Sequence, residues 1–136
     1  MNGLSTSTQN HHMMRVLKVG REAVEEAAEV VKNGGLVIYP TDTVYGLGCN
    51  PFDEDAVRRL VNAKKRRGKP LPIAVSSLEA AERIARFNDA ARRIARAFWP
   101  GAVTIVLECT AQLPHEVTAG TGRVGVRVPG YEWAVL

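Results

Sequence analysis

Apolar and polar positions alternate in two different ways along the first forty residues. In residues 19–35, "VGREAVEEAAEVVKNGG", apolar side chains recur every three or four positions among glutamates, which predicts an amphipathic helix. Asn33-Gly34-Gly35 predicts its end, because glycine readily adopts the left-handed conformation that closes a helix. The next residues, 36–39 "LVIY", predict a short strand that ends at Pro40.

The same two patterns continue to residue 129. Helices are predicted over residues 54–66 with Asp53 as the N-cap, over 78–87, where Ser76 and Glu79 match a capping box, and over 90–99, begun by Asn88 or Asp89. Strands are predicted over residues 71–77, 102–108 and 123–129. Because strands and helices interleave, the fold class expected is α/β or α+β with a mixed β-sheet.

The length and the two ends of the chain define its domain organisation. A chain of 136 residues with 46% hydrophobic residues fits one domain with a real core. Residues 1–14 are polar and lack the cationic and apolar regions of a signal peptide, so we expect a disordered tail before a domain at 15–136. No apolar run approaches the ~20 residues that span a bilayer, so no membrane contact is expected.

The two cysteines, Cys49 and Cys109, are far apart and form no C-x-x-C pair. This argues against a zinc ribbon or a redox motif and fits a reducing compartment, so we expect a cytoplasmic protein. Cys49 closely follows a polar cluster and could be read as a nucleophile, but a lone cysteine is more often a small packing residue.

That polar cluster is "YPTDTVYGLGCN", residues 39–50. Thr41, Asp42, Thr43 and Tyr45 place three hydroxyls and a carboxylate within five positions. They could satisfy backbone groups in a turn, or they could line a pocket for a small polar molecule.

The net charge of +4 is unevenly distributed. Residues 64–69, "KKRRGK", carry five cations in six positions, which fits binding of the phosphates of a nucleotide or a nucleic acid. A solvated helix end would explain the same run, since cations also favour the negative pole of a helix.

No glycine-rich phosphate loop accompanies these cations. The G-x-x-x-x-G-K-[ST] pattern is absent, and "GTGRVG", residues 120–125, runs into an alternating strand instead of a helix, so we interpret it as a hairpin or loop. Side chains must then hold any phosphates, and Lys64 and Arg66 offer a point charge and a planar fork. Arg127, within the strand "VGVRVP", either faces water or points into a site.

Three polar clusters therefore occur together: "PTDTVYG", "KKRRGKP" and "VTAGTGRVGVRVP". A pocket that offers hydroxyls, a lysine and two arginines suits a ligand with an amino-acid-like end and phosphates. The residues alone thus favour a small-molecule site over isolated turns.

The same motifs, in the same order, resemble the YrdC-like family. The resemblance rests on "GGLVIYPTDTVYGLGCNPFDEDAVRRL", "AKKRRGKPLPIAV", "WPGAVTIVL" and "PHEVTAGTGRVGVRVP", and covers about residues 15 to 130. It implies a twisted mixed β-sheet with flanking helices and a concave, positively charged cavity.

The resemblance also implies an activity, that of a threonylcarbamoyl-AMP synthase. Such a nucleotidyltransferase uses L-threonine, bicarbonate and ATP with Mg2+ and releases pyrophosphate. Its product supplies transfer RNA modifying enzymes with the threonylcarbamoyl group of the adenosine next to the anticodon. By similarity, Thr41 and Arg127 would bind threonine, Lys64, Arg66 and Thr118 would bind ATP, and no catalytic base or protein metal ligand is implied.

Two departures from the family pattern qualify these expectations. Arg67 stands where the family usually has proline after K-x-R, and the spacing to Pro70 is one residue short, so Lys65 or Arg67 could replace Lys64 or Arg66. The chain also ends at Leu136, before the family's S-x-A-N segment, so we expect a domain incomplete at its C-terminal end. An RNA-binding module and an inactive truncated remnant of the family are the alternatives to the enzyme.

Overall fold

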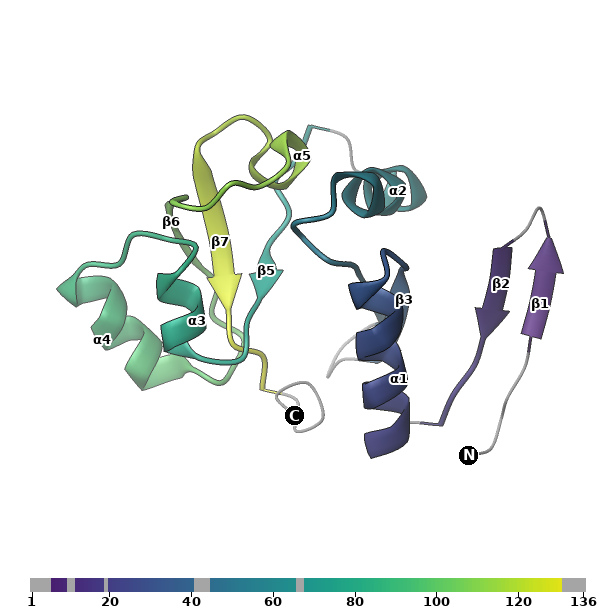
Figure 1. Ribbon diagram of the computed structural model, residues 1–136. Helices are drawn as coiled ribbons and strands as arrows, with labels where there is room; N and C mark the ends of the chain where they lie inside the picture. The colour runs from purple at the N-terminus through teal and green to yellow at the C-terminus, as the bar shows by residue number, and fades with distance from the viewer. Residues whose placement is uncertain (1–5, 10–11, 19, 41–44, 66–67, 131–136) are drawn as a thin grey trace.

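A computed structural model of the protein describes residues 6–9, 12–18, 20–40, 45–65 and 68–130 (Figure 1). Its helices and strands follow one another along the chain as β1 (Thr6–Gln9), β2 (His12–Arg15), α1 (Arg21–Lys32), β3 (Val37–Pro40), β4 (Tyr45–Gly48), α2 (Glu54–Lys64), β5 (Ile73–Ala74), α3 (Leu78–Glu82), α4 (Asp89–Phe98), β6 (Ile105–Glu108), α5 (His115–Thr118) and β7 (Arg123–Arg127).

The central sheet is mixed, as the interleaved pattern predicts. Strand β7 lies between its two neighbours, parallel to β5 and antiparallel to β6. Val126 faces Ile73 on one side and Ile105 on the other, so the middle of the sheet is aliphatic. Strands β3 and β4 form a separate antiparallel pair, in which Pro40 is opposite Tyr45. The α/β fold class is thereby confirmed.

One hydrophobic core joins the sheet to the helices. It takes apolar residues from α2, α3, α4 and α5 and from all three strands of the central sheet. Val57, Val117, Val124 and Val126 are its largest fully buried side chains. In Figure 1, α3 and α4 lie to one side of β7, and α1, α2 and β3 lie to the other.

Several helix boundaries are where the sequence places them. The Asp53 carboxylate accepts a hydrogen bond from the Ala56 N–H at 3.1 Å, and the Asn88 side chain accepts one from Ala91 N–H at 2.8 Å. Each bond satisfies one of the backbone donors left free in a first helical turn. Gly34, with φ of 87°, takes the left-handed position after α1.

The capping box assigned to Ser76 is wrong by one residue. Ser77 is the N-cap of α3, and its hydroxyl accepts a hydrogen bond from Ala80 N–H at 3.1 Å. The helix is also shorter than the predicted span of 78–87. Ile84 and Arg86 instead bond to the strand end, through Thr110 N–H to Ile84 O and Arg86 N–H to Glu108 O, both at 2.9 Å.

The first residues that the structure describes form a hairpin. The sequence predicts a disordered tail over residues 1–14, whereas the structure pairs β1 with β2 in an antiparallel hairpin. The strand-compatible residues Thr6 and Thr8 lie within this hairpin. Residues 131–136 lie outside the described part, so the domain limits of 15 and 136 stay predictions.

None of the helices in the described ranges is both long enough and apolar enough to cross a membrane.

Candidate functional site

Lys64 is the last residue of α2, and its side chain is exposed. The helix closes at Lys65, which has a φ of 53° in the left-handed region although it is not glycine. The Lys64 ammonium group therefore sits at the negative pole of α2, where it is also free to meet a ligand. This placement fits a phosphate-binding lysine and equally a solvated helix end, the two interpretations of the cationic run at residues 64–69.

Thr118 is the last residue of α5, and it is half-buried. Its hydroxyl donates a hydrogen bond to His115 O at 3.5 Å, and its carbonyl accepts one from the Thr121 hydroxyl at 2.7 Å. The loop that follows turns tightly, with positive φ values at Ala119, Gly120 and Gly122. This confirms the interpretation of "GTGRVG" as a loop that leads into a strand.

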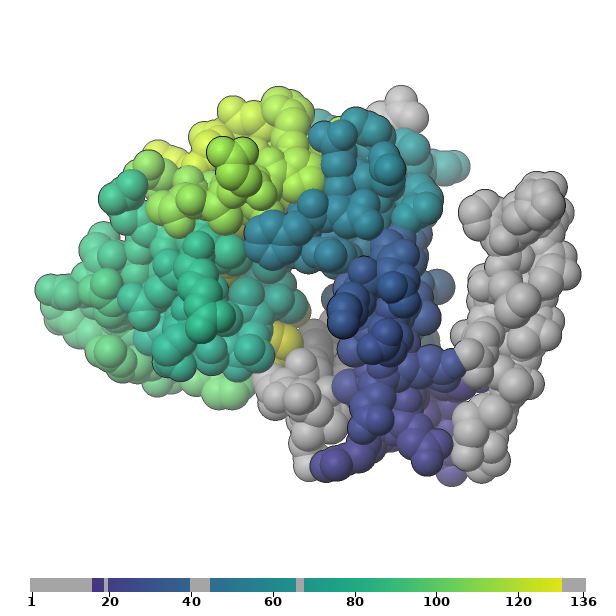
Figure 2. Space-filling view, viewed as in Figure 1, coloured from purple at the N-terminus to yellow at the C-terminus, as the bar shows by residue number. Residues whose placement is uncertain are grey.

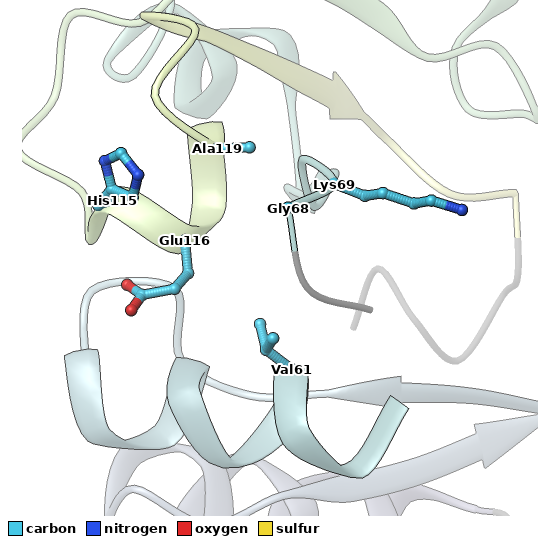
Figure 3. A pocket seen from close by; sticks show the side chains of 6 residues that line it. All are labelled: Val61, Gly68, Lys69, His115, Glu116 and Ala119. Carbon is cyan, nitrogen blue, oxygen red and sulfur yellow. The ribbon is translucent and has the colours of Figure 1, made fainter. Parts of the chain in front are cut away.

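The segment after the cationic run is tied to α5. Leu71 N–H donates to Val117 O at 2.9 Å, and α2 packs against α5. A small pocket of about 110 Å³ lies where the three segments meet, lined by Val61, Gly68, Lys69, His115, Glu116 and Ala119 (Figure 3). The structure thus places the end of the cationic run, Lys69, beside the helix that carries Thr118.

Arg127 lies on the opposite face of β7 from the core. Val124, Val126 and Val128 are buried, whereas Arg123 is exposed and Arg127 is half-buried. Alternation along a strand puts residues 123, 125 and 127 on one face. Arg123 and Arg127 are four positions apart along the strand, with roughly 13 Å between their Cα atoms, so they mark opposite ends of that face.

A groove of about 260 Å³ is hollowed into the same face of the sheet. Its lining is mostly apolar, with two hydroxyls and one guanidinium, and comprises Pro70, Leu71, Pro72, Thr104, Val106, Thr121, Arg123 and Gly125. Gly125 keeps the groove open, because a Cβ atom there would lie 3.0 Å from Thr104 Cγ2. An apolar floor with a cation at its rim suits a flat ring attached to an anionic group.

The pocket and the groove take part of their linings from the same two short segments. Residues 68–69 line the pocket and 70–72 line the groove, and the loop after α5 contributes Ala119 to one and Thr121 to the other. The segment 68–72 and the loop after α5 therefore each contribute to the lining of both cavities.

Two predicted site residues, Thr41 and Arg66, lie outside the described residues. The paired ends of β3 and β4, Pro40 and Tyr45, are placed, and α1 packs against β3. Figure 2 shows an open space between the α1–β3 part of the molecule and the part from α3 to β7. The proposed meeting of Thr41 with Lys64 and Arg127 thus stays a prediction.

Sequence reasoning missed Arg123, Thr104 and Gly125 as groove residues. The signal was present, because the alternation that places Arg127 opposite Val126 also places Arg123 and Gly125 beside it. Thr104 could not be found in this way, since only the pairing of β6 with β7 brings its strand to the groove.

Cys49 is half-buried and packs against the hydrophobic core. Burial raises the pKa of its thiol, and the nearby Asp53 carboxylate raises that pKa further, while Arg59 opposes both. A raised thiol pKa means less of the nucleophilic thiolate at neutral pH. The packing interpretation of Cys49 is therefore favoured over the nucleophile.

Within the described residues, no three His, Cys, Asp or Glu side chains gather as a metal site would require.

The model of the Sua5/YciO/YrdC family, described as telomere recombination, matches residues 29–136. The chain belongs to this family. A threonylcarbamoyl-AMP synthase of Pyrococcus abyssi is 42% identical over an alignment of 122 residues, and the match covers 85% of this chain and 36% of that protein. The synthase of Coxiella burnetii is 34% identical over an alignment of 118 residues, and the match covers 85% of this chain and 63% of that protein.

Solved structures agree with the family assignment. The crystal structure of P. abyssi Sua5 complexed with L-threonine has a TM-score of 0.80 and 39% identity, and the match covers 88% of this chain and 36% of that one. Escherichia coli YciO has a TM-score of 0.75 and 27% identity, with 84% of this chain and 56% of that one covered. The chain thus spans between about a third and two thirds of the length of these relatives.

Proposed function

We propose that the protein forms L-threonylcarbamoyladenylate from L-threonine, bicarbonate and ATP and releases pyrophosphate. The observation that carries the proposal is the identity of 34–42% with proteins named threonylcarbamoyl-AMP synthase, over 85% of this chain. A relative of known structure is complexed with L-threonine, which supports the amino-acid substrate.

The reaction joins two anions. The threonine amine adds to bicarbonate and water leaves, which gives an N-carboxylate. An oxygen of that carboxylate then attacks the α-phosphorus of ATP, and the bond to pyrophosphate breaks. Because both partners are negative, catalysis requires mainly positioning and neutralisation of charge.

The described residues suit this task through their charges and hydrogen-bonding groups. Lys64 would contact ATP phosphates from the end of α2, and Thr118 would donate a hydroxyl from α5. The groove next to Arg123 would hold the flat base, since its lining is mostly apolar. Arg127, at the far end of β7, would contact the threonine carboxylate together with Thr41, and Arg66 would join Lys64.

Magnesium enters the proposal with the nucleotide. We expect Mg2+ to be held by phosphate oxygens and water, the coordination that this ion prefers at nucleotide sites. It would supply charge neutralisation for the departing pyrophosphate. The product would then pass to enzymes that modify transfer RNA.

The proposal is tested with the 136-residue chain and ATP labelled in its γ-phosphate. We expect release of labelled pyrophosphate that requires both threonine and bicarbonate, measured by thin-layer chromatography. Pyrophosphate release that is unchanged when threonine is omitted would refute the proposal. Circular dichroism on the same sample establishes that the chain is folded during the assay.

A further inference from the structure

Helix α1 and the strand pair β3–β4 form a unit that has few firm contacts with the rest of the molecule. Of the residues of α1, all of which the structure describes, none is buried, and the helix packs against β3. Figure 2 shows the open space between this unit and the part from α3 to β7. Leu36, Leu47 and Cys49 pack against the hydrophobic core. Apolar contacts are not directional, so they hold the unit against the core without fixing its angle.

A directional contact joins the end of α1 to α2. The backbone after α1 turns at Gly34, whose N–H donates to Val31 O at 3.1 Å and whose φ is 87°. The carbonyl oxygen of Gly34 accepts a hydrogen bond from Arg59 Nη2. The guanidinium group therefore lies beside the C-terminal end of α1, the negative pole of that helix, although Arg59 belongs to α2.

The first turn of α2 meets the same glycine. Asp53 caps α2 with its Oδ1 atom, and a Cβ atom on Gly34 would lie 2.9 Å from Asp53 Oδ2 and 3.7 Å from Arg59 Nη2. Side chains of a helix lean toward its N-terminus, so Arg59 extends back along α2 toward the turn that Asp53 begins. Gly34 thus lies against both side chains, in a space that leaves no room for a Cβ atom.

Arg58, the preceding residue of α2, makes a different set of contacts. It pairs with Glu54 at 2.9 Å and with Asp55 at 3.5 Å, both in the first turn of α2, and lies 3.7 Å from Glu116 of α5. None of these three partners belongs to the α1–β3–β4 unit. Arg58 is therefore a matched control for any role of Arg59 that depends on the contact with Gly34.

We propose that Arg59 is a positioning residue that fixes the α1–β3–β4 unit relative to the C-terminal end of α2. A hydrogen bond from a charged donor is stronger than one between neutral groups, and this bond acts at the point where α1 leads into β3. Lys64, the last residue of α2, follows Arg59 by five positions, and β3 begins three positions after Gly34. The junction thus sets the place of the β3–β4 pair, which flanks the proposed threonine contact, relative to the proposed phosphate contact. This consequence rests on the proposed function, whereas the junction itself does not.

The two cysteines can report on the junction without any ligand. Cys49 follows β4 and packs against the core from the unit, whereas Cys109 follows β6 of the central sheet. Burial raises the pKa of the Cys49 thiol, Asp53 raises it further, and Arg59 lowers it. If Arg59 were only a nearby charge, its removal would leave less thiolate and slow the alkylation of Cys49. If Arg59 holds the unit in place, its removal opens the unit locally and speeds alkylation at Cys49 alone.

The first experiment compares alkylation by iodoacetamide at pH 8 in wild type, Arg59→Met and Arg58→Met, with both cysteines followed by mass spectrometry. Methionine keeps a long unbranched side chain but removes the charge and the donors. In Arg59→Met we expect Cys49 to react about three- to tenfold faster, the effect of one lost hydrogen bond on local opening, and Cys109 to keep its wild-type rate. Arg58→Met should leave both rates unchanged. An unchanged or slower reaction of Cys49, or equal acceleration of both cysteines, would overturn the proposal.

The second experiment connects the junction to the reaction. Isothermal titration calorimetry gives the ATP affinity of the same three proteins, and pyrophosphate release gives kcat/KM for threonine. We expect Arg59→Met to keep the ATP affinity within about twofold and to lower kcat/KM for threonine by about ten- to a hundredfold, as the misplacement of a reactant does. Faster alkylation of Cys49 with an unchanged kcat/KM would show that Arg59 only supports the fold and would overturn its positioning role. If the wild type released no pyrophosphate in response to threonine, the proposed function would fail, and the alkylation rate of Cys49 would still decide whether the junction exists.

Discussion

At the level of single residues, the cations differ in what their removal should change. Lys64 is exposed at the end of α2 and supports no core contact, so Lys64→Ala should affect activity more than stability. If it contacts developing phosphate charge, the loss in kcat/KM corresponds to about 2–4 kcal/mol. Pyrophosphate release and thermal melting of the same variant measure the two effects.

Lys32→Ala provides the matched control for this prediction. Lys32 is likewise exposed and lies in the last turn of a helix, α1, but it lines neither the pocket nor the groove. If both variants lost equal activity, Lys64 would be part of a solvated helix end and not of a phosphate site. The same conclusion would follow if a lower melting temperature explained the whole loss of activity in Lys64→Ala.

Cys49 gives a second prediction at this scale. Because burial and Asp53 raise its pKa, alkylation by iodoacetamide at pH 8 should be slower in the folded protein than in urea. Because folding raises the pKa of the Cys49 thiol, this group stabilises the folded state at pH values below the pKa of the unfolded chain. The stabilisation disappears as the pH rises through the pKa of the folded protein. Mass spectrometry of the peptide that contains Cys49 measures the rate, and equal rates in both states would contradict burial.

At the level of elements, the groove depends on the absence of one side chain in β7. Gly125→Val should fill the groove, because even a Cβ atom there lies 3.0 Å from Thr104 Cγ2. Valine suits a strand, but Thr104 must shift to admit it, so we expect a loss of about 1–3 kcal/mol of unfolding free energy and, in the folded protein, a higher KM for ATP. Steady-state kinetics and urea unfolding test the two parts.

Val106→Ala is the counterpart of that variant on the neighbouring strand. Val106 lines the same groove and is 60% exposed, so the substitution removes two methyl groups and widens the groove instead of filling it. If the KM for ATP rose equally in the two variants, the groove would not be the site that holds the base.

The elements were predictable wherever local chemistry decides them. Asp53 and Asn88 cap their helices as expected, since a side-chain acceptor next to free backbone donors is a local device. The early end of α3 was not predictable, because residues 84–86 bond to the end of β6, more than twenty positions away. The pairing of β4 with β3 was also missed, because polar turn residues hid the second strand of the hairpin.

At the level of the whole molecule, the site depends on segments that only the fold brings together. The sequence indicates separate clusters of hydroxyls and cations, and alternation predicts which face of β7 each side chain takes. It does not indicate that the α5 loop and the start of β5 border one groove, since these segments are some fifty positions apart. That arrangement follows from the parallel pairing of β5 with β7.

Two neighbours in β7 should therefore separate stability from function. Val126 is fully buried between Ile73 and Ile105, so Val126→Ala should cost about 2 kcal/mol of unfolding free energy, lower the urea midpoint and leave the slope unchanged. Arg127→Gln, on the outer face, should raise the KM for threonine more than that for ATP. Below the melting transition, Val126→Ala should keep the wild-type threonine dependence. If Val126→Ala altered the threonine KM as much as Arg127→Gln, the two faces of the strand would not be functionally distinct, and the outer surface could not be the substrate site.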